Sequence, residues 1–317
     1  MNEAFIMLKN VLLFVALALP GYVLVKTKIL KAEQSQTLSK LLTYVGMPFL
    51  IVTSTYDVPL NGEILWSLLA VVFGGVAYTF FVLLCSKPLT KREENPKTRG
   101  LMQFCMAFSN NGFLGIPLVI AVFGANSPVF VYYIGLNLIT NTLMNTLGLY
   151  LVSQDKKVVT AKRALLSPVV IALVLGVVLN LVKAFDYFPE GGQYSGYFSA
   201  IVTPLSMTVL GMKMGGIDLK SIFLSKKAYY VASLKLFFVP VALATVLVAC
   251  NLLLGLPKAI VVAGFITFAM PAPTLSSTFA DGFGGDTENA VTFTLLTTLL
   301  SVVTIPLLYF LICLCIV

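Results

Sequence analysis

The stretch Phe108-Ser-Asn-Asn-Gly-Phe-Leu-Gly-Ile-Pro117 interrupts a long apolar segment with two amides, a hydroxyl, two glycines and a proline. Proline lacks a backbone N–H and clashes with the preceding turn, so a helix cannot run undisturbed through Pro117. Pro117 would suit the first turn of a new helix, with Asn or Ser just ahead as caps. We therefore predict a broken membrane helix whose freed backbone groups line a protein-walled cavity or a substrate. The alternative is a proline kink packed against neighbouring helices.

The composition around this stretch is that of a polytopic membrane protein. Of 317 residues, 58% are hydrophobic and 11% are charged, and the mean hydropathy is +0.96. A soluble domain cannot bury so much apolar surface. The segment 5–25 lacks the cleavage site of a signal peptide. All five cysteines lie in apolar segments and histidine is absent, so we expect neither a disulfide framework nor a metal site, and no cofactor.

Ten segments are long enough to cross about 30 Å of hydrocarbon as helices. They are residues 5–25, 38–56, 63–85, 100–123, 129–152, 164–183, 197–217, 229–254, 258–280 and 288–316. The second and the seventh are short and polar. We therefore predict an all-α integral membrane fold of ten transmembrane helices.

Basic residues alternate between the connections of these segments. Sixteen lie in odd-numbered connections, against three in even-numbered ones and the N-terminal region. Because Lys and Arg accumulate on the cytoplasmic side, both termini should be extracytoplasmic in a multi-pass cell-membrane protein. The acidic ninth connection, with Asp281, Asp286 and Glu288, fits this rule poorly. The net charge of +8 is thus a topology signal, and we expect the lipid bilayer, not nucleic acid, as a partner.

Five segments precede the connection at 154–163 and five follow it, so a repeat of five would enter the membrane inverted the second time. The predicted units are 1–153 and 164–317. The fourth segment then matches the ninth, where Phe268-Ala-Met-Pro-Ala-Pro-Thr-Leu-Ser-Ser277 forms a second interruption. Interrupted helices at matched positions are typical of a binding site near the membrane midplane. We predict that helices four and nine are broken and cross there.

Two such breaks place two half-helix N-termini near the midplane, where their N–H groups and partial positive charge suit a carboxylate. The candidate substrate-binding residues are Asn110, Asn111, Gly112, Pro117, Pro271, Pro273, Thr274, Ser276, Ser277 and Asn141. The alternative for the amides and hydroxyls is hydrogen bonding between helices. Asn137, Asn141 and Asn145 form one polar stripe, which faces either neighbouring helices or the substrate.

Charges inside the segments are sparse. Lys213 lies near the cytoplasmic end of the seventh segment and can reach the interface along its apolar stem. Lys235 lies about 12 Å along a helix from Lys227. We hypothesise that it sits against the break in segment nine or four, where the carbonyls of the first half-helix lack partners. The alternative is a lysine that also extends to the cytoplasmic interface.

The ten segments, the Asn-Asn-Gly-Phe-Leu-Gly-Ile-Pro run and the Pro-Ala-Pro run at 271–273 resemble the auxin efflux carrier family, which includes bacterial malonate and malate permeases. The resemblance implies an elevator-type carrier, in which segments 1, 2, 6 and 7 form a scaffold and the others a transport unit. It also implies a small organic anion, a mono- or dicarboxylate such as malonate, malate or an auxin-like acid, held at the crossover.

We therefore expect a secondary carrier and not an enzyme, since there is no histidine, catalytic acid pair or nucleotide-binding loop. The alternatives are an anion channel and a membrane receptor without transport activity. A homodimer is compatible with the sequence, which leaves the substrate, the coupling ion, the direction of transport and the oligomeric state open.

Overall fold

The computed structural model describes residues 2–56, 62–125, 127–158, 168–217 and 219–316, and within them every regular element is helical. Six helical stretches are long and apolar enough to cross a membrane. They are Phe5–Lys26, Ala32–Tyr56, Trp66–Leu89, Pro96–Phe123, Lys226–Leu254 and Thr287–Cys313, and Val170–Leu181 and Lys258–Ala269 are shorter apolar helices. The all-α membrane class is thereby confirmed, whereas the inverted arrangement of ten spans stays a prediction.

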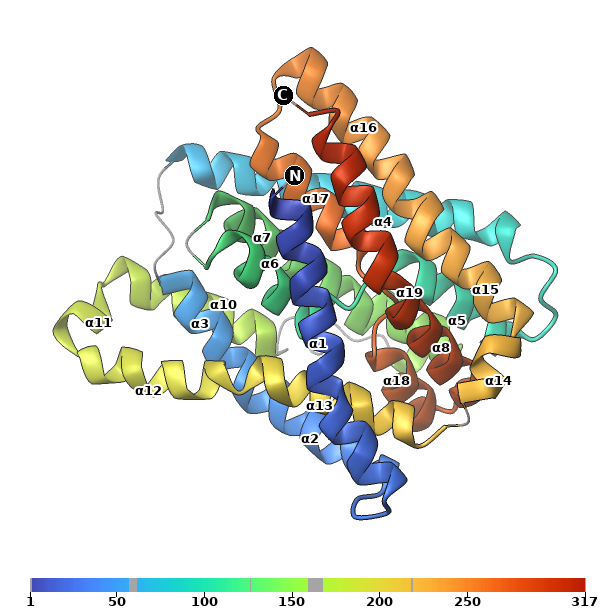
Figure 1. The fold of residues 1–317 in the computed structure, drawn as a ribbon. Helices are drawn as coiled ribbons and strands as arrows, with labels where there is room; N and C mark the ends of the chain where they lie inside the picture. The colour runs from blue at the N-terminus through green and yellow to red at the C-terminus, as the bar shows by residue number, and fades with distance from the viewer. Residues whose placement is uncertain (1, 57–61, 126, 159–167, 218, 317) are drawn as a thin grey trace.

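Figure 1 shows the helices coloured in chain order, from blue at the N-terminus to red at the C-terminus. In the first part they are α1 (Asn2–Lys26), η1 (Ala32–Gln34), α2 (Ser35–Leu41), η2 (Leu42–Gly46), α3 (Met47–Tyr56), α4 (Gly62–Leu89), α5 (Pro96–Ala107), η3 (Asn111–Gly115), α6 (Ile116–Phe123), α7 (Pro128–Leu143), η4 (Met144–Gly148), α8 (Leu149–Ser153) and η5 (Lys156–Val158). In the second part they are α10 (Pro168–Leu181), α11 (Ala184–Tyr187), α12 (Pro189–Ala200), α13 (Val202–Gly215), α14 (Leu219–Leu224), α15 (Lys226–Ser233), η6 (Leu234–Phe238), α16 (Val239–Leu254), α17 (Lys258–Ala269), α18 (Leu275–Phe283) and α19 (Thr287–Cys313).

Several helices begin earlier than the hydropathy of the sequence predicts, because polar caps and prolines extend them. The helix expected from residue 100 starts at Pro96, after Asn95, whose side chain accepts from the Lys97 N–H. The helix expected from 229 starts at Lys226, after a capping Ser225. Proline fits the first helical position and a side-chain oxygen satisfies a free N–H, so these starts need no apolar residues.

Three wide helical turns, in which the N–H bonds to the carbonyl five residues back, end just before a proline. These are η2 before Pro48, η3 before Pro117 and η6 before Pro240. Pro117 therefore does not begin the second half-helix as predicted. That half-helix begins at Asn111 and continues through Pro117. The Phe113 carbonyl, which Pro117 cannot serve, accepts instead from the Ser206 hydroxyl of α13 at 3.1 Å.

Helices α1 and α13 touch along their backbones. A Cβ atom on Gly21 would lie 2.0 Å from the Thr208 carbonyl oxygen, and one on Gly211 would lie 1.8 Å from that of Ala18. Small residues permit such approach between membrane helices, where van der Waals contact replaces the hydrophobic effect. The contact joins the first helix to one far along the chain.

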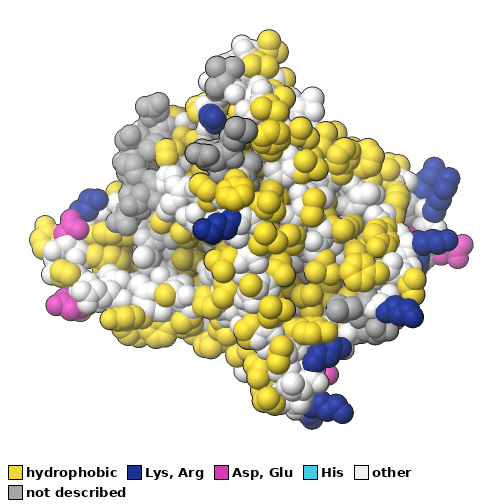
Figure 2. All heavy atoms as spheres, viewed as in Figure 1, with side chains coloured by type: hydrophobic (Ala, Val, Ile, Leu, Met, Phe, Trp, Pro, Cys, Tyr) yellow, Lys and Arg dark blue, Asp and Glu magenta, His cyan; other side chains and the backbone are white. Residues whose placement is uncertain are grey.

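Figure 2 shows a broad apolar surface over these helices, with Lys and Arg gathered along the lower and right margins of the view. Large apolar side chains of the described chain are exposed, among them Leu13, Phe237 and Leu253. A surface of this kind requires a hydrocarbon environment.

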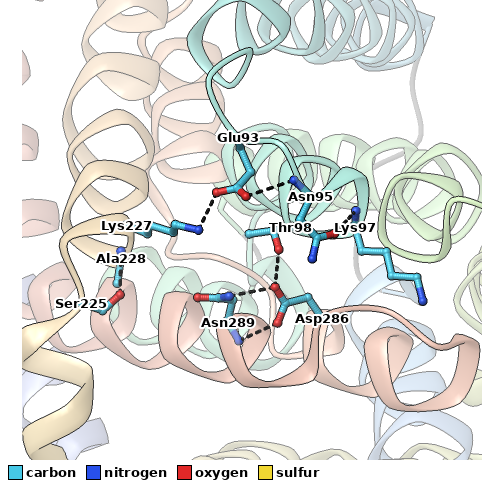
Figure 3. Close-up of polar contacts among 9 residues, drawn as sticks. All are labelled: Glu93, Asn95, Lys97, Thr98, Ser225, Lys227, Ala228, Asp286 and Asn289. Atoms are coloured by element: carbon cyan, nitrogen blue, oxygen red, sulfur yellow. Dashed lines mark hydrogen bonds and ion pairs between the residues drawn. The ribbon is translucent and has the colours of Figure 1, made fainter.

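The starts of α5, α15 and α19 meet in a polar group that we call the cap cluster, drawn in Figure 3. Lys227 forms an ion pair with Glu93 at 2.6 Å. Asp286 caps α19 through the Asn289 N–H, 3.1 Å away, and accepts from the Thr98 hydroxyl at 2.5 Å. Partial burial of Asp286 favours its neutral form, but the hydrogen bonds from Thr98 and Asn289, with the Lys227 charge, outweigh burial and lower its pKa. Asp286, in the acidic ninth connection, thus has a structural role: it caps α19 and binds the start of α5.

Candidate functional site

The two interruptions meet in the interior of the molecule. Helix α5 ends at Ala107 and the chain extends before η3 begins at Asn111, while α17 ends at Ala269 and α18 begins at Leu275. The Asn110 N–H donates to the Pro271 carbonyl at 2.8 Å. One freed backbone donor is thereby satisfied by the other interruption, which holds the two breaks side by side.

Both breaks border one cavity of about 480 Å³. Six of the predicted substrate-binding residues line it: Asn110, Asn111, Gly112, Asn141, Pro273 and Thr274. Gln36, Ser39, Lys40, Thr43 and Tyr44 contribute from the helices before residue 47. The described lining carries one cation, Lys40, and no carboxylate. A cavity of this size, with amides, hydroxyls and backbone at its base, can hold a small organic molecule.

Two adjacent asparagines at the first break have different surroundings. Asn111 donates to the Thr140 hydroxyl at 3.3 Å and its side-chain oxygen accepts from the Tyr133 hydroxyl at 3.2 Å. The Asn110 side chain has no hydrogen-bond partner among the described residues, although the residue is buried. Asn111 is therefore held in place by α7, whereas the amide of Asn110 is free to bind a ligand.

Lys235, in the wide turn η6, lies against the end of the first half-helix. Its side chain is fully buried, and its ammonium donates to the Ser109 hydroxyl at 2.6 Å and to the Met106 carbonyl at 3.5 Å. Met106 is in the last turn of α5, where carbonyls lack helical partners. No carboxylate of the described chain lies within ion-pair distance of the ammonium.

At the second break, hydroxyl groups of α19 bind the backbone. The Thr297 hydroxyl accepts from the Ala272 N–H at 3.1 Å, and the Thr294 hydroxyl donates to the Pro273 carbonyl at 3.2 Å. The Ser276 and Thr294 hydroxyls are 2.7 Å apart. The backbone of this break is thus bound to the next helix.

Lys213 of α13 does not extend to the interface as its position predicted. Its ammonium donates to the Thr274 carbonyl at 3.1 Å and to the Ser277 hydroxyl at 3.0 Å. The sequence shows a lysine near a segment end, which is also the pattern of an interfacial lysine. Only the position of α13 beside the start of α18 distinguishes an interfacial lysine from one that is bonded at the second break.

The remaining predicted residues are not part of the described cavity lining. Pro117 is inside α6, Pro271 binds Asn110, and Ser276 faces α19. Ser277 bonds to Lys213, and Lys235 to the first break. The contact of Pro117, Pro271, Ser276 and Ser277 with a substrate stays a prediction, as does the role of Lys235 as a charge at the crossover.

The asparagine stripe of α7 and η4 faces the cavity. Asn137, Asn141 and Asn145 all line it, and they are linked by hydrogen bonds from Asn141 to the Asn137 side chain at 3.4 Å and from Asn145 to the Asn141 carbonyl at 2.8 Å. Thr140, on the same stripe, joins it to Asn111. The stripe therefore both packs against the first break and borders the open space.

Comparison with known proteins identifies the chain's relatives. A family model described as "Membrane transport protein" matches residues 5–161 and 156–309. An uncharacterized transporter of Methanothermobacter thermautotrophicus is 30% identical over 213 residues, which cover 65% of this chain and 67% of that protein. The chain therefore belongs to the auxin efflux carrier-like family of membrane transport proteins, as its motifs predicted, and is a transporter and not an enzyme.

Proposed function

We propose that this membrane transport protein is a secondary carrier for a small organic anion, a mono- or dicarboxylate such as malonate, malate or an auxin-like acid. One observation carries the proposal: two interrupted helices border a cavity whose described lining has a lysine, many neutral donors and no acid. Half-helix N-termini attract carboxylates, and a lining without acids would not repel one.

The substrate is held where the interruptions meet. The amide of Asn110, which has no partner among the described residues, and the hydroxyl of Thr274 are the donors that a carboxylate would meet first. Asn141 offers a further amide from the facing helix. Asn111, fixed by Tyr133 and Thr140, shapes the site from behind.

Lys235 supplies a fixed positive charge at the first break. A buried ammonium is costly unless polar groups coordinate it, and here the Ser109 hydroxyl and a free carbonyl of α5 do so. The lysine neutralises the negative end of the half-helix and raises the potential near Asn110. A soluble cation is then not needed at this position.

Transport proceeds by an elevator-type movement within an inverted repeat. Two packed groups support this division: α3 lies against α10 and α12, and α1 against α13, whereas α17 lies against α7 and α16, and α15 against α19. The first group supplies the scaffold. The second, which α4 extends from α7 to α5, carries both breaks. A homodimer would bring two scaffolds together.

Transport into proteoliposomes tests the function. A labelled panel of malonate, malate and indole acetate should include at least one compound that enters saturably and exchanges in counterflow. A channel would conduct without counterflow, and a receptor would bind without uptake. If no carboxylate enters or binds, the proposal is wrong.

Cysteine labelling tests the membrane orientation, with the native cysteines replaced. Lys91 and Tyr187 are both exposed and lie in connections that the charge bias assigns to opposite sides. Lys91→Cys should react only with permeant reagents in intact cells, and Tyr187→Cys should react with impermeant ones. Labelling of both from one side would contradict the ten-span topology.

A further inference from the structure

The first turn of α18 gathers positive charge with no carboxylate of the described chain in direct contact. A helix N-terminus carries partial positive charge, and cations are disfavoured there. Yet the Lys213 ammonium lies at this turn, bonded to the Thr274 carbonyl and the Ser277 hydroxyl, neither of which carries a formal charge. Among the described residues no carboxylate is within ion-pair distance of it. Asp281, one turn past Ser277, acts on the Lys213 charge only from beyond ion-pair distance, and its side chain accepts from Gln36 at 3.2 Å.

The Thr274 hydroxyl at the same place has no hydrogen-bond partner among the described residues. The residue is only 4% exposed, and it lines the cavity between Pro273 and Leu275. A buried hydroxyl without a partner is unfavourable in the free protein, and most such groups in proteins are bonded. Its position at the cavity makes a ligand atom the natural partner.

We propose that the start of α18, the Thr274 hydroxyl and Lys213 together form a carboxylate subsite, in which Lys213 makes the carrier respond to the charge of its substrate. The Thr274 hydroxyl and the first amides of α18 hydrogen-bond the carboxylate. Lys213 supplies the formal charge from the adjoining helix. This inference rests on the proposed function and adds to it the residue that separates a carboxylate from its neutral isostere.

The two other lysines near the site cannot take this part. Lys235 is bonded at the first break, beside Ser109. Lys40 is exposed, and a charge in contact with water is strongly screened. Lys213 alone among the three is joined to Thr274, so its removal should alter charge selectivity and leave the shape of the cavity unchanged.

Binding to the purified protein in nanodiscs tests the subsite. The probe is whichever of malonate, malate and indole acetate binds the unmodified protein most tightly, together with its amide. Lys213→Met should weaken binding of the carboxylate roughly ten- to hundredfold and change that of the amide by less than about twofold. Lys213→Arg should keep most of the preference. Lys226→Met, at an exposed lysine, is the matched control.

Four outcomes of this binding experiment support or overturn the proposed subsite. Loss of carboxylate preference in Lys213→Met supports the subsite. Unchanged carboxylate affinity in Lys213→Met, with weakened binding in Asn110→Ala, overturns the subsite and leaves the proposed function standing. Equal weakening of acid and amide also overturns it, because it shows general damage. If no carboxylate binds the unmodified protein, both proposals fall.

Thr274→Val gives a second route if Lys213→Met does not fold. Valine keeps the shape of threonine and removes the hydroxyl, which bonds to nothing in the described structure. The variant should therefore fold with unchanged or higher thermal stability and bind the carboxylate at least tenfold more weakly. Carboxylate binding equal to that of the unmodified protein would overturn the subsite.

Discussion

The interruptions at 108–110 and 270–274 free the same kinds of backbone groups and stabilise them differently. The side chains that bind the first break include the ammonium of Lys235, 126 positions away in the chain. The second break is bound by hydroxyl groups of the following helix, the nearest 25 positions away, and by the Lys213 ammonium only at its last residue, Thr274. A charge acts over several ångströms, whereas a hydroxyl acts by contact. We call the first the electrostatic break, because a remote buried charge binds it. We call the second the hydroxyl-bonded break, because neighbouring hydroxyl groups bind its backbone in addition to the Lys213 charge at its end.

The largest expected effect lies at the electrostatic break. Lys235→Met keeps the apolar stem but removes the charge from the Met106 carbonyl and Ser109. We expect a loss of about 3 kcal/mol or more in the functional state, so uptake should fall more than hundredfold and the melting temperature should drop. Lys226→Met, in the same helical stretch, should have neither effect. Near-normal uptake and melting in Lys235→Met would show that no cation is needed there.

The asparagines of the first break should separate binding from stability. Asn110→Ala should weaken substrate binding roughly ten- to hundredfold, since a hydrogen bond to a charged group contributes about 1.5–3 kcal/mol. Asn111→Ala should also lower the melting temperature, because Tyr133 and Thr140 lose their partner. Calorimetric binding and thermal melting measure the two effects, with Asn10→Ala as a surface control. Equal melting temperatures for both variants would contradict this distinction.

A smaller effect is expected at the hydroxyl-bonded break. Ser276→Ala leaves Thr294 without one partner, and the loss of a neutral hydrogen bond costs about 1 kcal/mol. In a chain of this size that lowers the melting temperature by roughly 2 °C. Substrate affinity should change little, because Ser276 faces α19 and not the cavity. A large loss of affinity with unchanged melting would instead make Ser276 a direct substrate contact.

The smallest effect concerns the start of α19, which carries the hydroxyls of the second break. The pKa of Asp286 is lowered in the folded protein, so its stabilisation is present above the ordinary carboxyl pKa and is lost as pH falls through the lower folded value. The difference in melting temperature between the unmodified protein and Asp286→Asn should be constant from about pH 7 to 5 and shrink below about pH 4. A difference that shrinks near pH 6 would contradict this assignment.

The sequence predicted what depends on local pattern. Hydropathy predicted the helical membrane class, and the prolines and polar residues predicted where the helices at 96–123 and 258–283 are interrupted. The position of the restart at Asn111 could not be predicted, because it involves a tertiary hydrogen bond: the Ser206 hydroxyl of α13 donates to the Phe113 carbonyl, which the N–H-less Pro117 cannot do. The position of the Lys213 ammonium also could not be predicted, because tertiary contacts with the start of α18 determine where this long flexible side chain lies.

The backbone contact between Gly21 and α13 also bears on how the protein is made. Gly21 leaves the ribosome 190 positions before Gly211, counted along the printed sequence. At the usual 5 to 20 residues per second, α1 waits roughly 10 to 40 s for its partner. During that time its glycine-bearing side faces lipid or another protein, and the contact that joins the two parts of the chain closes only when the seventh predicted span enters the membrane.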